Sequence, residues 1–133
     1  MARILLIDDD DAVRGMLSYA LDHYGHTVTE ACNGREGLEL LARSEIDLVL
    51  TDIVMPEMEG LAVLMELRKK QPPVKIIAMS GGAREGAGDY LHVAKLMGAG
   101  KVLGKPFSTE VLLAAIRELL PNDCAAPRMA PSA

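Results

Sequence analysis

The sequence predicts an α/β fold: a doubly wound, five-stranded parallel sheet with helices on both faces. Short runs rich in Ile, Val and Leu alternate with longer segments of helical period, which is the pattern of βα units. These runs are apolar almost throughout, as is typical of parallel strands that are buried on both faces. The five expected strands are residues 3–7, 27–31, 47–51, 74–79 and 101–103.

Each expected strand is followed by a segment with apolar residues at helical spacing. The first helix ends at Gly25, a residue type common just after a helix. Helices are also expected over 34–43, over 60–70, after the glycine-rich residues 81–88, and after the N-cap Ser108. The side chains expected to face the sheet are Val13, Met16, Leu17, Ala20, Leu21 and Tyr24, then Leu38, Leu41 and Ala42, then Tyr90, Val93, Ala94 and Met97, and finally Val111, Leu112, Ala115, Ile116 and Leu119.

The composition is that of one ordinary globular domain. Of the 133 residues, half are apolar and a quarter are charged, so we expect one core within residues 1–120. Residues 121–133 are rich in Pro and Ala without periodicity, which predicts a disordered tail. The apolar run at residues 4–7 is too short for a signal peptide or a membrane span, which predicts a cytoplasmic protein.

Charge and cysteine content exclude other classes. A formal charge of −5, without a basic cluster, argues against direct nucleic-acid binding. Cys32 and Cys124 lack the spacing of a metal site, and we expect two free thiols. The histidines, His23, His26 and His92, are expected at the surface without a role.

Polar residues gather where the expected strands end. In an open parallel sheet, ligands bind beyond the carboxyl ends of the strands, where the strand order reverses. Only the second strand ends without such a residue, as suits an edge strand. The polar residues at the other four ends are Asp8 and Asp9, Asp52, Ser80, and Lys105.

Three of these residues predict a cation site. If the strand order is 2-1-3-4-5, Asp8, Asp9 and Asp52 share one small cleft, and three like charges at close range need a cation. A few carboxylates combined with retained waters suit Mg²⁺ better than Ca²⁺. With repulsion offset in this way, an ionised Asp52 can attack phosphorus, while Lys105 and the Ser80 hydroxyl contact phosphoryl oxygens.

The motifs around these residues resemble the receiver domains of two-component response regulators. The resemblance covers residues 1–120. It rests on residues 4–10 (Ile-Leu-Leu-Ile-Asp-Asp-Asp), 48–60 (Leu-Val-Leu-Thr-Asp-Ile-Val-Met-Pro-Glu-Met-Glu-Gly), 76–81 (Ile-Ile-Ala-Met-Ser-Gly) and 104–107 (Gly-Lys-Pro-Phe). It implies a flavodoxin-like (βα)5 fold with strand order 2-1-3-4-5.

The resemblance also implies a role for each site residue. Asp52 would be the phosphoacceptor, and Mg²⁺ would be held by Asp8, Asp9, Asp52 and the Val54 carbonyl. Ser80 would be the switch hydroxyl, Lys105 would contact phosphate, and a cis peptide would precede Pro106. The phosphoryl group would come from a sensor histidine kinase or a histidine phosphotransferase. A downstream protein would bind the face formed by the fourth helix, fifth strand and fifth helix.

One departure from the family bears on the switch. The family often has an aromatic residue three positions before the lysine, and this sequence has Val102 there. The stretch from Ser80 to Lys105 carries extra residues in its glycine-rich part, 81–88. We therefore expect phosphate to order this loop in place of a swinging ring.

The same sequence is open to other interpretations. Asp10 and Asp11 fit a helix N-terminus, where carboxylates are favoured.

The chain is interpreted as a stand-alone receiver or, alternatively, a piece of a longer regulator or kinase. A Mg²⁺-dependent phosphatase would need a general acid two residues after the nucleophile, where this sequence has Val54. A degenerate receiver that only binds partners would not need Asp8, Asp9, Asp52, Ser80 and Lys105 intact.

Overall fold

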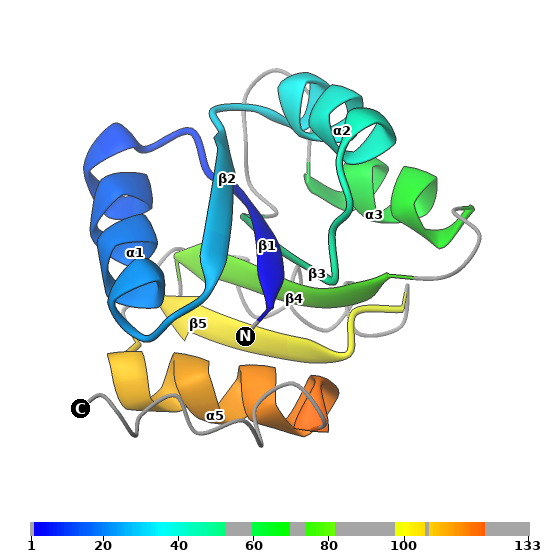
Figure 1. The fold of residues 1–133 in the computed structure, drawn as a ribbon. Helices are drawn as coiled ribbons and strands as arrows, with labels where there is room; N and C mark the ends of the chain where they lie inside the picture. The colour runs from blue at the N-terminus through cyan, green and yellow to red at the C-terminus, as the bar shows by residue number, and fades with distance from the viewer. Residues whose placement is uncertain (1, 53–59, 70–73, 82–97, 106, 122–133) are drawn as a thin grey trace.

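Five parallel strands form one sheet in the order β2-β1-β3-β4-β5 (Figure 1), which confirms the predicted fold class and strand order. The computed structural model describes residues 2–52, 60–69, 74–81, 98–105 and 107–121. The predicted fourth helix and, apart from Pro121, the predicted tail 121–133 lie outside these residues. In chain order the elements are β1 (Arg3–Ile7), α1 (Asp11–His23), β2 (Thr27–Ala31), α2 (Gly34–Arg43), β3 (Leu48–Asp52), α3 (Gly60–Arg68), β4 (Lys75–Gly81), β5 (Lys101–Lys105) and α5 (Thr109–Leu119).

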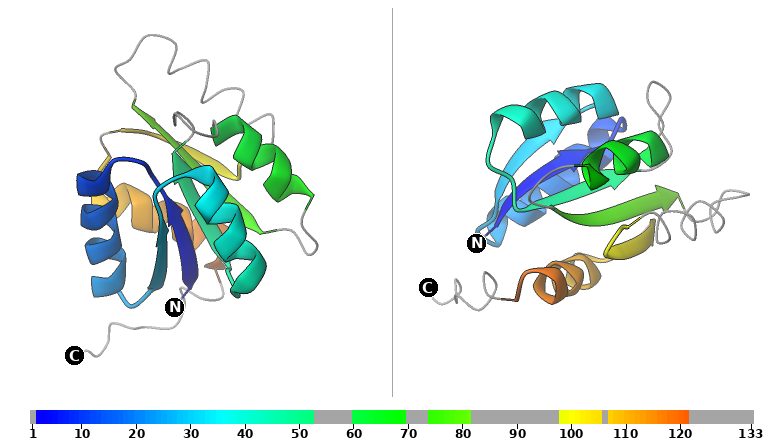
Figure 2. Two further views of the ribbon diagram at one scale, coloured as in Figure 1. Left: turned by 90° about the horizontal axis from the view of Figure 1, so that it is seen from above. Right: turned by 90° about the vertical axis from the view of Figure 1, so that its right-hand side faces the viewer.

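Helices cover both faces of the sheet, with α1 and α5 on one side and α2 and α3 on the other (Figure 2). The alternation of side chains along β1 separates the two cores. Ile4 and Leu6 join the buried cluster that includes Leu112 of α5. Leu5 and Ile7 join the cluster of α2 and α3. The apolar run in β1 is therefore explained by burial on both faces.

Three strands continue further than the sequence pattern predicted. Asp52, Ser80 and Lys105 were expected just after strands, and each lies within one. The parallel ladder pairs Ser80 with Gly104 and Gly81 with Lys105. Backbone groups make this ladder, so a polar side chain does not end a strand. The site residues consequently sit on paired backbone.

The edge strands correct the expectation of burial on both faces. Strand β2 has only Ala31 fully buried, and Thr27 and Glu30 are exposed. Strand β5, at the opposite edge, is half-buried along most of its length. An edge strand has a neighbour on one side only, and the helices cover it incompletely. The prediction that the second strand lies at an edge is confirmed.

On each helix, the sequence predicted a wider buried apolar face, or stripe, than the structure shows. Leu21 of α1 and Leu112, Ala115 and Ile116 of α5 are buried as expected. The exposed exceptions are Met16, Tyr24, Ala42 and Val111, the first of these with 67% of its surface accessible. A helix lying on a sheet touches it along a narrow line, so apolar residues at the margins of the stripe remain in solvent.

Capping residues begin the helices as the sequence indicated. Oδ1 of Asp10 accepts hydrogen bonds from the amides of Ala12 and Val13 at the start of α1. The Ser108 hydroxyl accepts one from the amide of Val111 at the start of α5. Each cap satisfies amides that have no partner within the helix. Gly25, just after α1, has a φ of 94°, the left-handed conformation that glycine adopts without strain.

The amino-terminal end of the sheet is tied together by side chains that the sequence did not reveal. His26 is buried, and its Nδ1 accepts a hydrogen bond from the amide of Ala2 at 3.0 Å. The expectation that His26 lies at the surface without a role is therefore wrong, because its backbone leads directly into β2 beside the start of β1. His23 is exposed as expected, and His92 lies outside the described residues.

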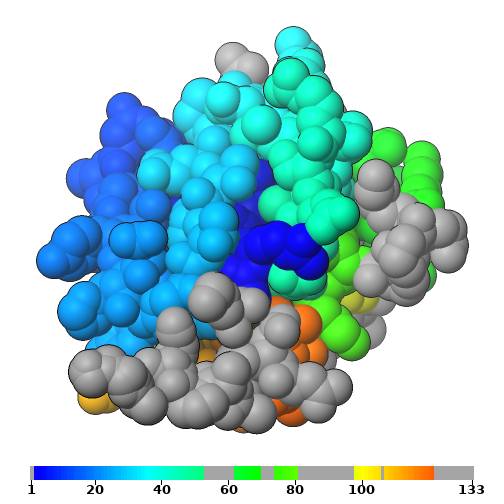
Figure 3. Space-filling model, in the orientation of Figure 1, coloured from blue at the N-terminus to red at the C-terminus, as the bar shows by residue number. Residues whose placement is uncertain are grey.

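Arg3 completes this end of the sheet. Its guanidinium binds Glu45 and Asp47. The dark-blue start of the chain reaches the surface between lighter blue and teal segments in Figure 3. These hydrogen bonds lower the pKa of Asp47.

Two further expectations concern the whole chain. Cys32 is a free, exposed thiol, as predicted, whereas Cys124 lies beyond the described part of the chain. Within the described residues, no helix has the length and apolar character needed to cross a membrane.

Two helical glycines provide a paired test of the packing beneath the site. A Cβ on Gly37 of α2 would lie 2.8 Å from Cγ1 of the fully buried Ile7, and still closer to its Cδ1. A Cβ on Gly15 of α1 would meet nothing within 4 Å. We expect Gly37→Ala to lower the free energy of unfolding by about 1–3 kcal/mol through overpacking. Gly15→Ala should raise it by about 0.5–1 kcal/mol through helix propensity.

Urea denaturation followed by circular dichroism measures both free energies. Equal stability of Gly37→Ala and the wild type would show that α2 does not pack on Ile7 as closely as described.

Candidate functional site

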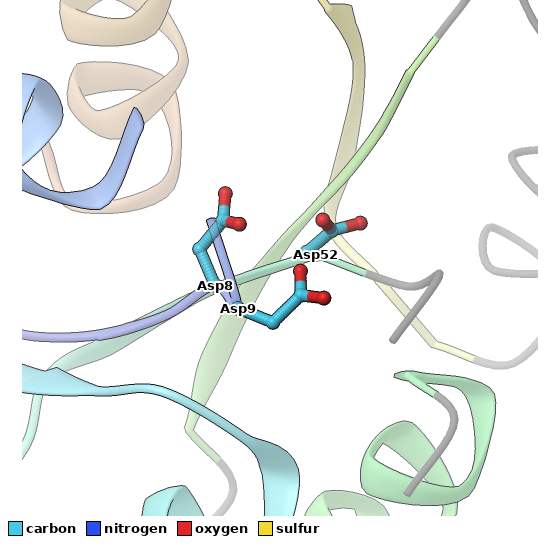
Figure 4. A group of neighbouring side chains, drawn as sticks. All are labelled: Asp8, Asp9 and Asp52. Atoms are coloured by element: carbon cyan, nitrogen blue, oxygen red, sulfur yellow. The ribbon is translucent and has the colours of Figure 1, made fainter. Parts of the chain in front are cut away.

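Three carboxylates converge at the carboxyl ends of the two central strands. Asp8 and Asp9 follow β1, and Asp52 is the last residue of β3. One carboxylate oxygen from each lies within 4.8 Å of the others, and Figure 4 shows the side chains gathered around a shared space. The strand register explains this convergence, because Ile7 pairs with Thr51 and each of these two residues is followed by an aspartate. The structure thus brings together the predicted cluster.

The two neighbouring aspartates after β1 have different surroundings. Asp8 is fully buried, its amide donates to the Ala31 carbonyl, and its Oδ1 accepts from the amide of Asp10. Asp9 is exposed. Asp8 is therefore held in place on the buried side of the cluster, whereas Asp9 lies on its solvent-exposed side.

Lys105 enters the cluster from β5. Its Nζ donates to Oδ2 of Asp8 at 2.9 Å and to Oδ2 of Asp52 at 3.1 Å. Burial disfavours the charged amine, but the hydrogen bond to Asp8 and the charge of Asp52 outweigh burial and raise the pKa of Lys105. Lys105 remains charged at neutral pH and offsets part of the repulsion between the two buried carboxylates.

Ser80 lies on β4, between the strands that carry Asp52 and Lys105. It is buried, and among the described residues its hydroxyl oxygen has no hydrogen-bond partner. A buried hydroxyl normally has a partner in a native protein, since leaving it unpaired costs free energy. An unpaired hydroxyl beside a cluster of charged groups indicates a place for a ligand oxygen.

The charge balance of the cluster suits a divalent cation. Among the described residues, the cluster brings together three carboxylates and one ammonium group, so acidic groups exceed basic ones by two. All the side-chain ligands that the cluster offers are oxygens, the type that hard cations such as Mg²⁺ select. The donor set therefore fits the ion that the sequence predicted.

Arg14 of α1 is a neighbour of the cluster that the sequence analysis missed. Its Nη1 donates to the backbone carbonyl of Asp8 at 2.7 Å, and its other nitrogens bind Asp11 and Glu30. The spacing of Asp11 and Arg14 indicates a pair on one helix face. The contacts with Asp8 and Glu30 join different elements and leave no local signal in the sequence.

Several predicted features fall on residues that the structure does not describe. They are the Val54 carbonyl, the peptide before Pro106, and the loop 82–88. Val102, at the position where the family often has an aromatic residue, is half-buried and packs against the core of α2 and α3.

Comparison with known proteins places this site in context. Residues 4–117 match the family model of the response regulator receiver domain. The chain is 41% identical over 121 residues to the sensor kinase CckA of Brucella abortus, covering 90% of this chain and 12% of the kinase. It is 41% identical over 119 residues to the response regulator MprA of Mycolicibacterium vanbaalenii, covering 89% of this chain and 50% of MprA. The chain thus spans half or less of these relatives.

Solved structures show the same similarity. A response regulator receiver domain protein from Clostridium thermocellum has a TM-score of 0.84 and 30% identity, and the match covers 94% of this chain and 98% of that one. Response regulator TrrA from Thermotoga maritima, crystallised with Mg²⁺ and BeF, has a TM-score of 0.79 and 32% identity. That match covers 90% of this chain and all of TrrA.

Removing the lysine should expose the cost of the clustered carboxylates. Lys105→Met removes the ammonium group that binds the two buried carboxylates of Asp8 and Asp52, so we expect the free energy of unfolding in EDTA to fall by about 1–3 kcal/mol. The matched control is Lys101→Met on the same strand, because Lys101 pairs with the exposed Glu118. It should cost less than about 1 kcal/mol. Equal losses in the two variants, measured by urea denaturation, would contradict a stabilising role for Lys105 in the cluster.

Proposed function

The chain belongs to the response regulator receiver domain family, and on this premise we propose that Asp52 accepts a phosphoryl group from a phosphohistidine. The donor would be a sensor histidine kinase or a histidine phosphotransferase in the cytoplasm. The observation that carries the proposal is the convergence of three carboxylates and Lys105, with the buried Ser80 hydroxyl on the strand between Asp52 and Lys105 and without a hydrogen-bond partner in the described part of the chain. This arrangement supplies a nucleophile, ligands for a cation, and two donors for phosphoryl oxygens.

The reaction is a displacement at phosphorus. A carboxylate oxygen of Asp52 forms a bond to phosphorus while the bond from phosphorus to the donor imidazole breaks, and the imidazole leaves with the electron pair. Asp52 is buried at a strand end, so its orientation is fixed before the donor arrives. Orientation of this kind lowers the barrier to transfer.

The remaining residues stabilise the charge that the transfer brings into the site. Mg²⁺ held by Asp8, Asp9, Asp52 and the Val54 carbonyl would offset charge on the phosphoryl oxygens. Lys105 already lies 3.1 Å from Asp52, so its ammonium can hold a phosphoryl oxygen attached there. Ser80 can donate its hydroxyl proton to another oxygen, and so gain a hydrogen bond that no described residue supplies.

Phosphorylation would change the surface that a downstream protein recognises. Lys105 connects the site to β5, and the Ser80 backbone pairs with Gly104 of the same strand. A change in either contact is transmitted directly to β5 and α5. We propose that the face formed by the fourth helix, β5 and α5 binds the target, and that the chain, with its charge of −5, does not itself bind DNA.

The same residues argue against turnover of external phosphoesters. Leaving alkoxides need a proton, and the sequence has Val54 where a phosphatase would carry its acid. The imidazole of a phosphohistidine and the acetate of acetyl phosphate leave without such help. We therefore propose a phosphoacceptor that has no other substrate.

Phosphorylation can be tested without knowing the partner. Incubation with acetyl phosphate and Mg²⁺ should add one labile phosphoryl group to the wild type, and none when EDTA is present or when Asp52 is replaced in Asp52→Asn. The control Asp22→Asn removes an exposed carboxylate of α1 and should be modified like the wild type. Intact-mass spectrometry reads the result. Equal modification of Asp52→Asn would place the phosphoryl group on another residue.

Two neighbouring aspartates provide a paired test of the cation site. Asp9→Asn removes a charge from the cluster, and we expect at least a tenfold rise in the Kd for Mg²⁺ measured by calorimetry. Asp10→Asn removes a charge one position away, outside the cluster, and Asn is an equally good helix cap. It should bind Mg²⁺ within about twofold of the wild type, because the charge it removes is exposed and screened. Equal weakening by both substitutions would indicate a diffuse effect of net charge and no defined site.

A further inference from the structure

Arg14 holds the backbone of the acidic cluster without belonging to it. Its side chain is 15% exposed, and all three guanidinium nitrogens are engaged. Nη1 donates to the Asp8 carbonyl at 2.7 Å, Nη2 donates to Asp11 at 2.7 Å, and Nε donates to Glu30 at 3.1 Å. Glu30 lies on β2 and Asp11 begins α1, so one side chain joins two elements to the end of β1.

The bond to the Asp8 carbonyl fixes a particular part of the site. That carbonyl belongs to the peptide between Asp8 and Asp9, and a peptide is planar. Holding its oxygen therefore sets the direction in which the chain continues to Asp9. The other polar groups of Asp8 are also held, by Ala31, Asp10 and Lys105.

The side chain of Asp9 differs in this respect. It is exposed, and it supplies one of the three clustered carboxylates. The direction of the Asp9 backbone therefore has a large effect on the position of the Asp9 carboxylate oxygen.

We propose that Arg14 is a positioning residue, which orients the Asp8–Asp9 peptide so that the Asp9 carboxylate faces Asp52 and the divalent cation between them. This inference rests on the proposed function, because it assigns Arg14 to the same site. Arg14 touches neither the reacting oxygen nor, in this assignment, the cation. It acts through the Asp8–Asp9 peptide, which sets the position of the Asp9 carboxylate.

A purely electrostatic role for Arg14 predicts the opposite result. Arg14 is a positive charge close to a cation site, so removing it would strengthen Mg²⁺ binding by Coulomb's law. A positioning role predicts that removing it weakens binding, because the Asp9 carboxylate loses its orientation. The sign of the change in affinity thus separates the two.

The test uses two substitutions at Arg14 in the full chain, with Mg²⁺ as the probe. Arg14→Gln removes the charge and the forked donors. Arg14→Lys keeps the charge but cannot hold Asp8, Asp11 and Glu30 together in a planar fork. Partners that orient metal ligands contribute 10–100-fold to affinity, so we expect Arg14→Gln to raise the Kd for Mg²⁺ by about tenfold or more. Arg14→Lys should raise it by a smaller factor. Arg35→Gln, which removes an exposed arginine of α2, is the control and should leave the Kd unchanged.

Calorimetry measures these affinities on protein whose fold is checked by circular dichroism. A Kd that falls in Arg14→Gln, or stays at the wild-type value in both Arg14 variants, overturns the inference. If the wild type binds Mg²⁺ but gains no phosphoryl group, only the proposed function is contradicted. The role of Arg14 is still decided by comparing the Kd values of the variants. Wild type that binds no Mg²⁺ overturns the inference together with the cation site.

A second measurement needs no cation. The Asp8 carbonyl carbon can be observed by triple-resonance nuclear magnetic resonance of metal-free protein. Loss of the hydrogen bond should shift this resonance upfield in Arg14→Gln and leave it in place in Arg35→Gln. An unchanged resonance in Arg14→Gln would show that Arg14 does not hold the carbonyl, and would overturn the inference.

Discussion

Repulsion among three carboxylates at the carboxyl ends of β1 and β3 is the constraint around which this structure is organised. Asp8 and Asp52 are buried, and like charges at such distances destabilise a protein unless a cation accompanies them. Lys105 supplies one positive charge from β5, which lies three positions away from β1 in the sheet. Three carboxylates against one ammonium group form a donor set that suits a divalent cation. In the proposed function, a cation bound there would relieve the repulsion within the cluster.

The scaffold must hold these charges in place, and β1 carries most of that task. Its side chains enter both cores in alternation, so its end cannot shift without disturbing α1 and α5 on one face or α2 and α3 on the other. Gly37 lets α2 lie directly on Ile7, the residue before Asp8. The backbone at Asp8 is held again from the side of α1 by Arg14. Rigid strands and packed helices therefore place the carboxylates more accurately than a loop would.

In the proposed function, such a cluster suits a phosphoacceptor better than a catalyst with many turnovers. It would supply a nucleophile, cation ligands and hydrogen-bond donors to phosphoryl oxygens, whereas the residue two positions after Asp52 is Val54, which cannot protonate a leaving group. In the proposed reaction, the product would remain attached to Asp52 and change the partners of Lys105 and Ser80. Because Ser80 and Lys105 sit on paired backbone of β4 and β5, such a change would reach the edge strand β5 directly. The membership of the chain in the receiver family agrees with this interpretation.

The sequence by itself determined the α/β class, the strand order through its resemblance to a family, the helix caps Asp10 and Ser108, and the candidate residues at the strand ends. These features are local: apolar periodicity, capping chemistry and motif spacing are all read within a few neighbouring positions. Only the tertiary structure decided that Asp8 is buried and Asp9 exposed, that Arg14 holds the Asp8 carbonyl, and that His26 receives the Ala2 amide. Each of these depends on the side of a strand or helix that a neighbouring element covers. Contacts between elements that are distant along the chain follow from packing, and packing leaves no periodic pattern in the sequence.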